Sequence, residues 1–194
     1  MSFFEPLPAP APEDVGRWAP PVWDRPSEGT LPAIVPIGEI VHRRDDVVVE
    51  LDHVRVYPNG FTINLFILTN PHLGHGRAGR AMLGGAGADP TRRFPRIGVR
   101  FADGRTAGRK GGFRGHADVI KNDQGIPTEP ILMWSGGGGG TGGYHFSVWV
   151  FPLPPDGPLE VHVSLPDADA PESKVVVDGA AIRAAADRAK IIWS

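Results

Sequence analysis

Residues 46–70 read DVVVELDHVRVYPNGFTINLFILTN, and this stretch decides the fold. On both sides of Pro58-Asn59-Gly60, apolar residues alternate with polar ones, which is the pattern of a strand with one buried face. Asn and Gly tolerate the positive φ that a tight turn requires, so these three residues predict the turn of a β-hairpin. We therefore expect two adjacent antiparallel strands here.

The first of these two strands contains a change of phase. Val49 and Leu51 are apolar at one parity, whereas Val54 and Val56 continue the apolar set at the other. Side chains of a strand alternate between its two faces, so a slip of one residue would turn part of the apolar set toward solvent. One extra residue, a β-bulge, restores the phase. The sequence predicts this bulge around Asp52-His53.

Other short segments with the same alternation follow, separated by turn residues. The chain contains 26 Gly and 21 Pro, which favours turns and short strands over a helical bundle. The segments are 97–101, 131–134, 144–151, 159–165 and 175–177. Seven or eight strands in a turn-rich chain predict a mainly β protein, an antiparallel β-sandwich (immunoglobulin-like or similar), with a partly open barrel as the alternative.

The C-terminal tail changes to a helical period, and Asp178 precedes it as a candidate N-cap. The residues at helical spacing are Ile182, Ala185, Ala186, Ala189 and Trp193. We expect one C-terminal α-helix over about 179–192 whose narrow alanine face packs on a sheet.

Residues 1–32 form a distinct arm with eight prolines. Proline fixes φ and lacks a backbone donor, so we expect an extended Pro-rich arm, followed by a single domain over 33–194. Aromatic side chains on such a segment suit docking onto a surface, either of its own domain or of a neighbour. The candidate partner-binding residues are Phe3, Phe4, Trp18 and Trp23.

The run WSGGGGGTGGY occupies residues 134–144, and seven of the nine residues 135–143 are glycine. A phosphate-binding loop of the Walker type would end in Lys and Ser or Thr and would open a helix, whereas this run opens a strand. We therefore expect 135–143 to be the tip of a hairpin, with Trp134 and Tyr144 stacked across its base. The sequence leaves open whether this tip binds anything.

The formal net charge of −2 is spread unevenly along the chain. Residues 77–114 carry ten of the twenty Lys and Arg but only two acids, so their net charge is +8. Such a stretch indicates an anionic partner, or self-association through opposite patches. It lacks a recognition helix and interleaved aromatic residues, so nucleic acid would be bound through phosphates. The candidate anion-binding residues are Arg92, Arg93, Arg96, Arg100, Arg105, Arg109 and Lys110.

Two histidines, His72 and His75, lie three residues apart in a long connection without a strand period. Two histidines in a loop can reach one metal ion, with His116, Asp118 or His53 as alternatives for a third ligand. No spacing fixes that third ligand, so we predict no metal site.

No catalytic constellation follows from the sequence either. Ser135, His145 and Asp118 are the residue types of a hydrolytic triad, but no nucleophile elbow surrounds Ser135. The chain has no cysteine, which excludes disulfides, a thiolate zinc site and a cysteine nucleophile. We predict no catalytic residue and no cofactor.

The expected location is the cytoplasm. The absence of cysteine favours a reducing compartment. The first residues, MSFFEPLPAPAPEDVG, lack the basic start and apolar run of a signal peptide, and no stretch reaches the roughly 20 apolar residues that span a bilayer. We expect no membrane partner.

Two segments of the chain resemble a group of uncharacterised proteins of high-GC Gram-positive bacteria. They are residues 39–70, beginning EIVHRRDD, and residues 144–189, which include the turn PLPPDGPL and the alanine-rich tail. The resemblance implies a bacterial source and a single-domain layout. It implies no activity, cofactor or catalytic residue.

The function that the sequence favours is a non-enzymatic interaction or structural module whose arm and loops contact another protein or a second copy. One alternative is a polyanion or nucleic-acid binder that uses the arginine-rich stretch 77–114. A second alternative is a small-molecule or metal-dependent enzyme that uses the loop histidines.

Overall fold

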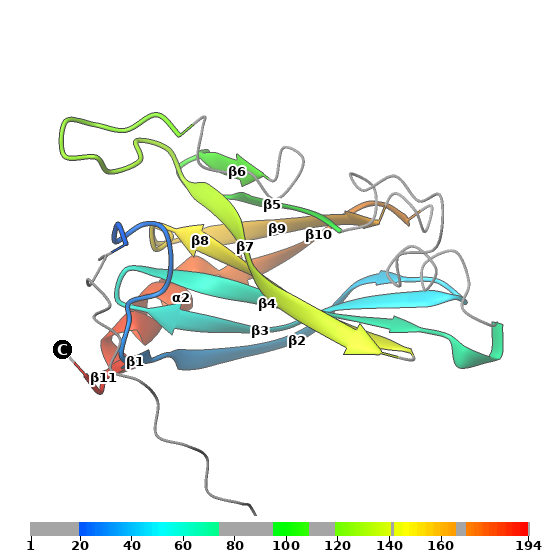
Figure 1. Cartoon of the computed structure of the whole chain (residues 1–194). Coiled ribbons are helices and arrows are strands. Elements are labelled where there is room, and N and C mark those ends of the chain that lie inside the picture. The colour runs from blue at the N-terminus through cyan, green and yellow to red at the C-terminus, as the bar shows by residue number, and fades with distance from the viewer. Residues whose placement is uncertain (1–19, 74–94, 109–118, 141, 166–169, 194) are drawn as a thin grey trace, which may run out of the picture.

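The computed structural model describes residues 20–73, 95–108, 119–140, 142–165 and 170–193. The described residues form an antiparallel β-sandwich of two main sheets, with a small two-stranded sheet besides (Figure 1). The five-stranded sheet has the order β2 (Ala33–Arg43), β3 (Val47–Tyr57), β4 (Gly60–Thr69), β8 (Gly143–Phe151) and β7 (Ile131–Gly140). The four-stranded sheet has the order β10 (Ala170–Asp178), β9 (Pro158–Leu165), β5 (Arg96–Arg100) and β6 (Thr106–Gly108). The prediction of a sandwich is confirmed.

The core fills the space between the inner faces of the two sheets. Every second residue of β4 faces inward, and Phe61, Ile63, Leu65 and Ile67 are all buried. The alternating valines and leucines of β9 and the apolar residues of β5 approach them from the other sheet. Burial of apolar area on this scale is the dominant favourable term in folding, and it fixes the register of every central strand.

The hairpin of β3 and β4 is present as expected, with Tyr57 paired to Gly60 across a two-residue turn. The predicted bulge is also present. Leu51 pairs with Leu65 and His53 pairs with Asn64, which leaves Asp52 as the extra residue of β3. As a result the valines on both sides of the bulge are buried in the same core.

The glycine run belongs to a hairpin, as predicted, but most of it is paired strand rather than hairpin tip. Strand β7 continues from Ile131 through Gly140, and β8 begins at Gly143. The expectation that 135–143 is a loop is therefore wrong. Pairing with β8, which is itself anchored in the core by β4, extends the glycines into a strand despite their weak intrinsic preference for one.

The expected stacking of Trp134 on Tyr144 is also wrong. The glycines between the two aromatic residues are paired strand, so Trp134 lies opposite Val148 and Tyr144 lies opposite Gly139. Ser135 is an extra residue that shifts the register of β7 against β8 by one position. The indole meets the Phe146 ring edge to face at 5.4 Å and covers Gly137, where a Cβ atom would come within 2.7 Å of it. Gly137 is thus required by packing.

The C-terminal helix is shorter than the predicted 179–192. Helix α2 spans Gly179–Ala185, a 3-10 turn η3 spans Ala186–Arg188, and the chain then becomes extended and pairs as β11 (Lys190–Ile191) with β1 (Thr30–Leu31). The Asp178 side chain accepts a hydrogen bond from the Ala180 amide at 2.9 Å, which confirms the N-cap.

The buried face of α2 is likewise shorter than expected. Ile182 and Ala185 are buried against β2, β3 and β9, whereas Trp193 lies beyond the helix and is 75% exposed.

A second 3-10 turn, η1, spans Pro71–Leu73. Within the described residues, no helix is both long enough and apolar enough to cross a membrane.

The described part of the predicted arm, from residue 20 onward, packs against its own domain. Trp23 is only 3% exposed, and its indole donates a hydrogen bond to the Gly125 carbonyl at 2.9 Å. The Trp23 carbonyl accepts one from the indole of Trp149 at 2.8 Å, on the outer face of the five-stranded sheet. Asn59, in the hairpin turn, donates to the carbonyls of Val22 and Arg25. This segment therefore covers one end of that outer face.

Replacement of Trp23 by alanine tests this packing. We expect W23A to lower the free energy of unfolding by about 3 kcal/mol, because it removes a buried indole and uncovers Trp149. The neighbouring change V22A serves as the control, since Val22 is exposed. Urea unfolding followed by tryptophan fluorescence measures both. Equal stability of the two variants would show that the segment does not contribute to the domain.

Candidate functional site

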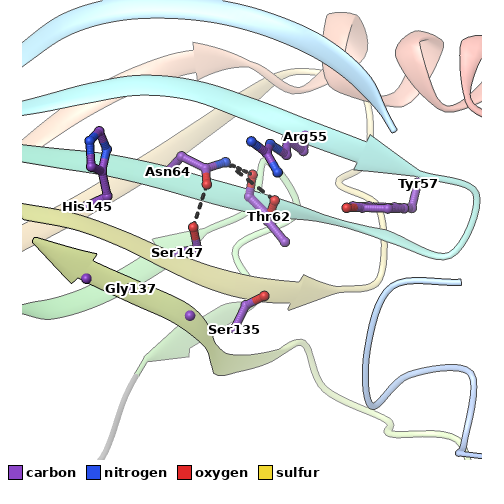
Figure 2. Close-up of a pocket in the computed structure, with 10 residues that line it drawn as sticks. Arg55, Tyr57, Thr62, Asn64, Ser135, Gly137, His145 and Ser147 are labelled. Carbon is purple, nitrogen blue, oxygen red and sulfur yellow. Dashed lines mark hydrogen bonds between the residues drawn. The ribbon is translucent and has the colours of Figure 1, made fainter. Parts of the chain in front are cut away.

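A groove of about 450 Å³ lies on the outer face of the five-stranded sheet (Figure 2). It occupies the part of that face next to the segment covered by Trp23, and its lining comes from β3, β4, β8 and β7. The lining residues are Arg55, Tyr57, Thr62, Asn64, Ser135, Gly136, Gly137, Gly138, His145 and Ser147. None of them carries a carboxylate, and most offer a hydroxyl, an amide or bare backbone.

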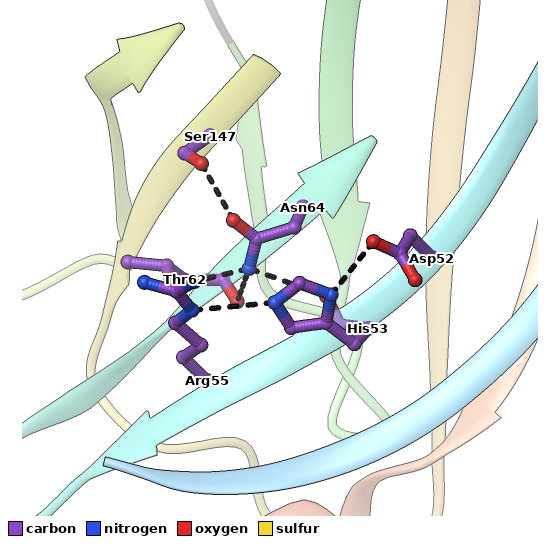
Figure 3. A network of polar contacts seen from close by, with 6 residues as sticks. All are labelled: Asp52, His53, Arg55, Thr62, Asn64 and Ser147. Atoms are coloured by element: carbon purple, nitrogen blue, oxygen red, sulfur yellow. Dashed lines mark hydrogen bonds and ion pairs between the residues drawn. The ribbon is translucent and has the colours of Figure 1, made fainter. Parts of the chain in front are cut away.

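Three residues of one transverse row of the sheet, Asn64, Ser147 and Gly136, line the groove, and His53 continues the row beside it. The strand registers place His53, Asn64, Ser147 and Gly136 opposite one another across β3, β4, β8 and β7. Asn64 lies at the centre of this row. Its amide oxygen accepts the Ser147 hydroxyl at 2.5 Å, and its amide nitrogen lies 3.3 Å from the His53 carbonyl and 3.4 Å from the Thr62 hydroxyl (Figure 3). These contacts fix the orientation of the Asn64 side chain.

The bulge in β3 builds a second polar chain beside this row. The Nδ1 atom of His53 lies 2.8 Å from a carboxylate oxygen of Asp52, and the Nε of Arg55 donates to the Nε2 atom of His53 at 3.3 Å. Figure 3 shows the three side chains in line. Because arginine is always a donor, this contact gives Nε2 the acceptor role and leaves Nδ1 as the donor to Asp52. Asp52 thus orients His53, which in turn orients Arg55.

Arg55 differs in its surroundings from several other arginines of the fold. Arg44 is paired with Asp46 at 3.0 Å, and Arg105 with Asp103 at 2.8 Å, in each case two residues away along the chain. The side chain that contacts Arg55 from two residues away is His53 instead of an acid. No described carboxylate forms an ion pair with Arg55. The groove is therefore positively charged at this wall.

Tyr57 stands next to Arg55 at the covered end of the groove. Its ring meets Trp149 edge to face at 6.0 Å. Burial of the phenol raises the pKa of Tyr57 above its usual 10.0, and the nearby positive charge of Arg55 opposes the shift. The hydroxyl therefore stays protonated at neutral pH and remains available as a donor.

The opposite wall is the edge strand β7, and two of its glycines face the groove with open space. A Cβ atom built on Gly136 or Gly138 would meet nothing within 4 Å, in contrast to the packed position of Gly137. The fold does not require glycine at these two positions. Glycine within a strand often marks a place where a ligand or another backbone approaches closely.

The groove does not assemble a nucleophile and a base. The Ser147 hydroxyl donates to the Asn64 amide, and both ring nitrogens of His53 are engaged. His145 lies against Phe66 at a centroid distance of 4.6 Å, and no hydrogen bond links it to a hydroxyl of the described lining residues.

The predicted site residues are not brought together at this groove. Phe3, Phe4, Trp18, Arg92, Arg93, Arg109 and Lys110 lie outside the described residues. Trp23 is buried within its own domain. Arg96 and Arg100 lie on β5 of the other sheet, and Arg105 lies in the turn before β6 of that sheet.

The loop histidines give no described metal centre. His72 lies exposed in η1, while His75, His116 and Asp118 fall outside the described residues. His53 is held by its contacts with Asp52 and Arg55. Across the ranges that the structure describes, no group of three His, Cys, Asp or Glu side chains could hold a metal ion.

Sequence reasoning found the bulge but missed the groove that it helps to form. Arg55, Asn64 and Ser147 stand at polar positions of otherwise apolar strands, which by itself indicates only a solvent-facing side. The available signal was the coincidence of Asp52-His53 at the bulge with polar residues on both sides of it, since bulges are frequent next to functional sites.

Comparisons with known proteins add no assignment. No protein-family model matches the chain, and searches of the curated proteins and of the solved structures return no significant match. The resemblance to the bacterial group stays a prediction, and a function for this chain has to be inferred from the geometry of the groove.

A second polar cluster lies on the outer face of the four-stranded sheet, around Glu160. Lys174 donates to its carboxylate at 2.7 Å, His162 lies 3.0 Å away and Arg100 lies 3.4 Å away. The hydrogen bond from Lys174, followed by that from His162, lowers the pKa of Glu160 from 4.5 to about 2. Arg100 is thus already paired with an acid.

The lowered pKa predicts a stability that depends on pH. Ionised Glu160 stabilises the fold above its unfolded pKa of 4.5, and this contribution is lost as pH falls from 4.5 toward 2. We expect E160Q to be less stable than the unaltered protein at pH 6 and the difference to shrink toward pH 2. E39Q, at an exposed glutamate without an ion pair among the described residues, is the control. Urea denaturation at a series of pH values measures the free energy of unfolding of all three proteins. A difference in this free energy between E160Q and the unaltered protein that stays constant with pH would contradict this account.

Proposed function

We propose that this protein is a non-enzymatic interaction module that binds its ligand or partner segment in the groove on the outer face of the five-stranded sheet. The observation that carries the proposal is the groove itself, in which polar side chains from four strands converge opposite a bare glycine edge. A volume of about 450 Å³ falls within the range of small-molecule sites, about 300–1,000 Å³.

The groove is organised in advance of any ligand. Asn64 is held by Ser147 and Thr62, and the exposed Arg55 side chain contacts His53 at 3.3 Å, so part of the side-chain freedom is already lost before binding. Binding to a preorganised site costs less entropy than binding to a mobile one. Four strands of one sheet supply the lining, which supports a specific ligand over a merely solvated surface.

The groove also replaces the arm as the proposed contact surface. Residues 20–32 pack on their own domain, with Trp23 buried, so the described part of the arm offers few free aromatic groups. Arg100 and Arg105 are paired with Glu160 and Asp103, which makes a polyanion site on that sheet less favourable. A cytoplasmic location remains part of the proposal, on the grounds of the chain's lack of cysteine.

Filling the groove from its glycine wall tests the proposal. In G138Y the new side chain enters open space, so the fold should be retained while the groove is blocked. G108Y is the matched control, because Gly108 is an exposed strand glycine of the other sheet and also has open space. We expect compounds found with the unaltered protein to bind G108Y equally and to lose most of their affinity for G138Y.

The measurement is a two-dimensional ¹H–¹⁵N NMR screen with small polar molecules and short peptides. Ligands of the groove should shift the amide signals of Gly136, Gly138, His145 and Ser147. Ligands that bind G138Y as well as they bind G108Y, or whose shifts map to other parts of the chain, would show that the groove is not the binding site.

A further inference from the structure

We propose that the ligand of the groove presents an oxyanion, a carboxylate or a phosphate group, and that Arg55 binds it. This inference rests on the proposed function and specifies the chemistry of its ligand. It follows from three features of the described residues: the part of Arg55 that is left free, the way Arg55 is held, and the nature of the surrounding donors.

The free part of Arg55 is the end of its guanidinium group. The Nε atom donates to His53, while the two terminal nitrogens make no hydrogen bond or ion pair with any described residue. Two parallel N–H groups at this end match the two oxygens of a carboxylate or a phosphate. A lysine would supply the charge without this fork.

The way in which Arg55 is held orients the side chain without neutralising it. Arg44 and Arg105 are held directly by Asp46 and Asp103, and their charges are thereby compensated. Beside the groove the carboxylate of Asp52 contacts His53 instead, and the His53 imidazole accepts a hydrogen bond from Arg55. The imidazole lies between the carboxylate and the guanidinium, so Asp52 does not occupy the terminal nitrogens of Arg55, which stay available to an anion.

The other groups around the groove favour the same kind of ligand. The lining contains no acid, and the hydroxyls of Tyr57 and Ser135 can donate to an oxyanion. The Ser147 hydroxyl and the Asn64 amide are occupied with each other, so they shape the floor rather than compete for the ligand. The positive charge of Arg55 and the free hydroxyl donors together complement an anionic ligand group best.

Titration with sodium phosphate and with sodium acetate tests the inference, at an ionic strength kept constant with chloride. The ¹H–¹⁵N spectrum reports both the backbone amides and the Nε–H group of Arg55. We expect at least one of the two anions to shift the Arg55 side-chain signal and the amides of Gly136 and Ser147 in a saturable manner. The anion with the higher affinity identifies a phosphate or a carboxylate as the natural group.

Three variants supply the controls. R55Q should weaken binding of the preferred anion by about tenfold or more, the typical loss for a charge-assisted hydrogen bond. R55K keeps the charge but not the fork, so we expect an intermediate affinity. R96Q removes the same charge from an exposed arginine of the other sheet and should leave the affinity unchanged.

The outcomes separate this inference from the proposed function. If neither anion shifts the groove signals while uncharged compounds of the NMR screen do, the oxyanion inference is overturned and the binding module stands. If R96Q weakens the binding of the anion and R55Q does not, the anion site belongs to the other sheet. If anions and uncharged compounds alike bind away from the groove, the inference and the proposed function both fall.

Discussion

Strand β3 must present apolar side chains to one core along its whole length, although its sequence changes phase in the middle. The extra residue Asp52 reconciles the two halves, since it lets Leu51 and Val54 both point inward. The same irregularity brings Asp52 into contact with the neighbouring His53, whose ring reaches Arg55. The constraint that keeps the core intact therefore also positions the charged wall of the groove.

The outer face of the five-stranded sheet is divided into a covered end and an open end. At the covered end, Trp149 is buried although it points away from the core, because the segment around Trp23 lies over it. At the open end, His145 and Gly138 remain accessible from solvent. A sandwich needs only one buried face for each sheet, so the open end is surface that the fold leaves free for another use.

The parts of the fold that were predictable are those with a visible alternation of side chains. The β3–β4 hairpin and its bulge follow from the spacing of valines and leucines alone. The glycine strand was not predictable, since residues without side chains show no alternation and only the pairing with β8 extends them. The helix end was missed for a related reason: the alanine period continues past Ala185, but pairing with β1 draws the chain into an extended conformation.

The groove depends on registers between strands that lie far apart in the chain. Asn64 and Ser147 are separated by 83 positions and meet only because β4 pairs with β8. Nothing in the local sequence around either residue encodes that meeting. In contrast, the Asp52–His53–Arg55 chain is local, and the phase change at Asp52 indicates its position from the sequence alone.

The protonation of the His53 ring tests the central claim most directly, because only one tautomer lets Asp52 hold the ring and the ring hold Arg55. Two-dimensional ¹H–¹⁵N NMR tuned to long-range couplings assigns the proton to Nδ1 or Nε2 near pH 8. The account predicts a fixed Nδ1–H tautomer for His53, whereas exposed His145 should show exchange between both forms. An Nε2–H tautomer, or exchange at His53 like that of His145, would contradict it.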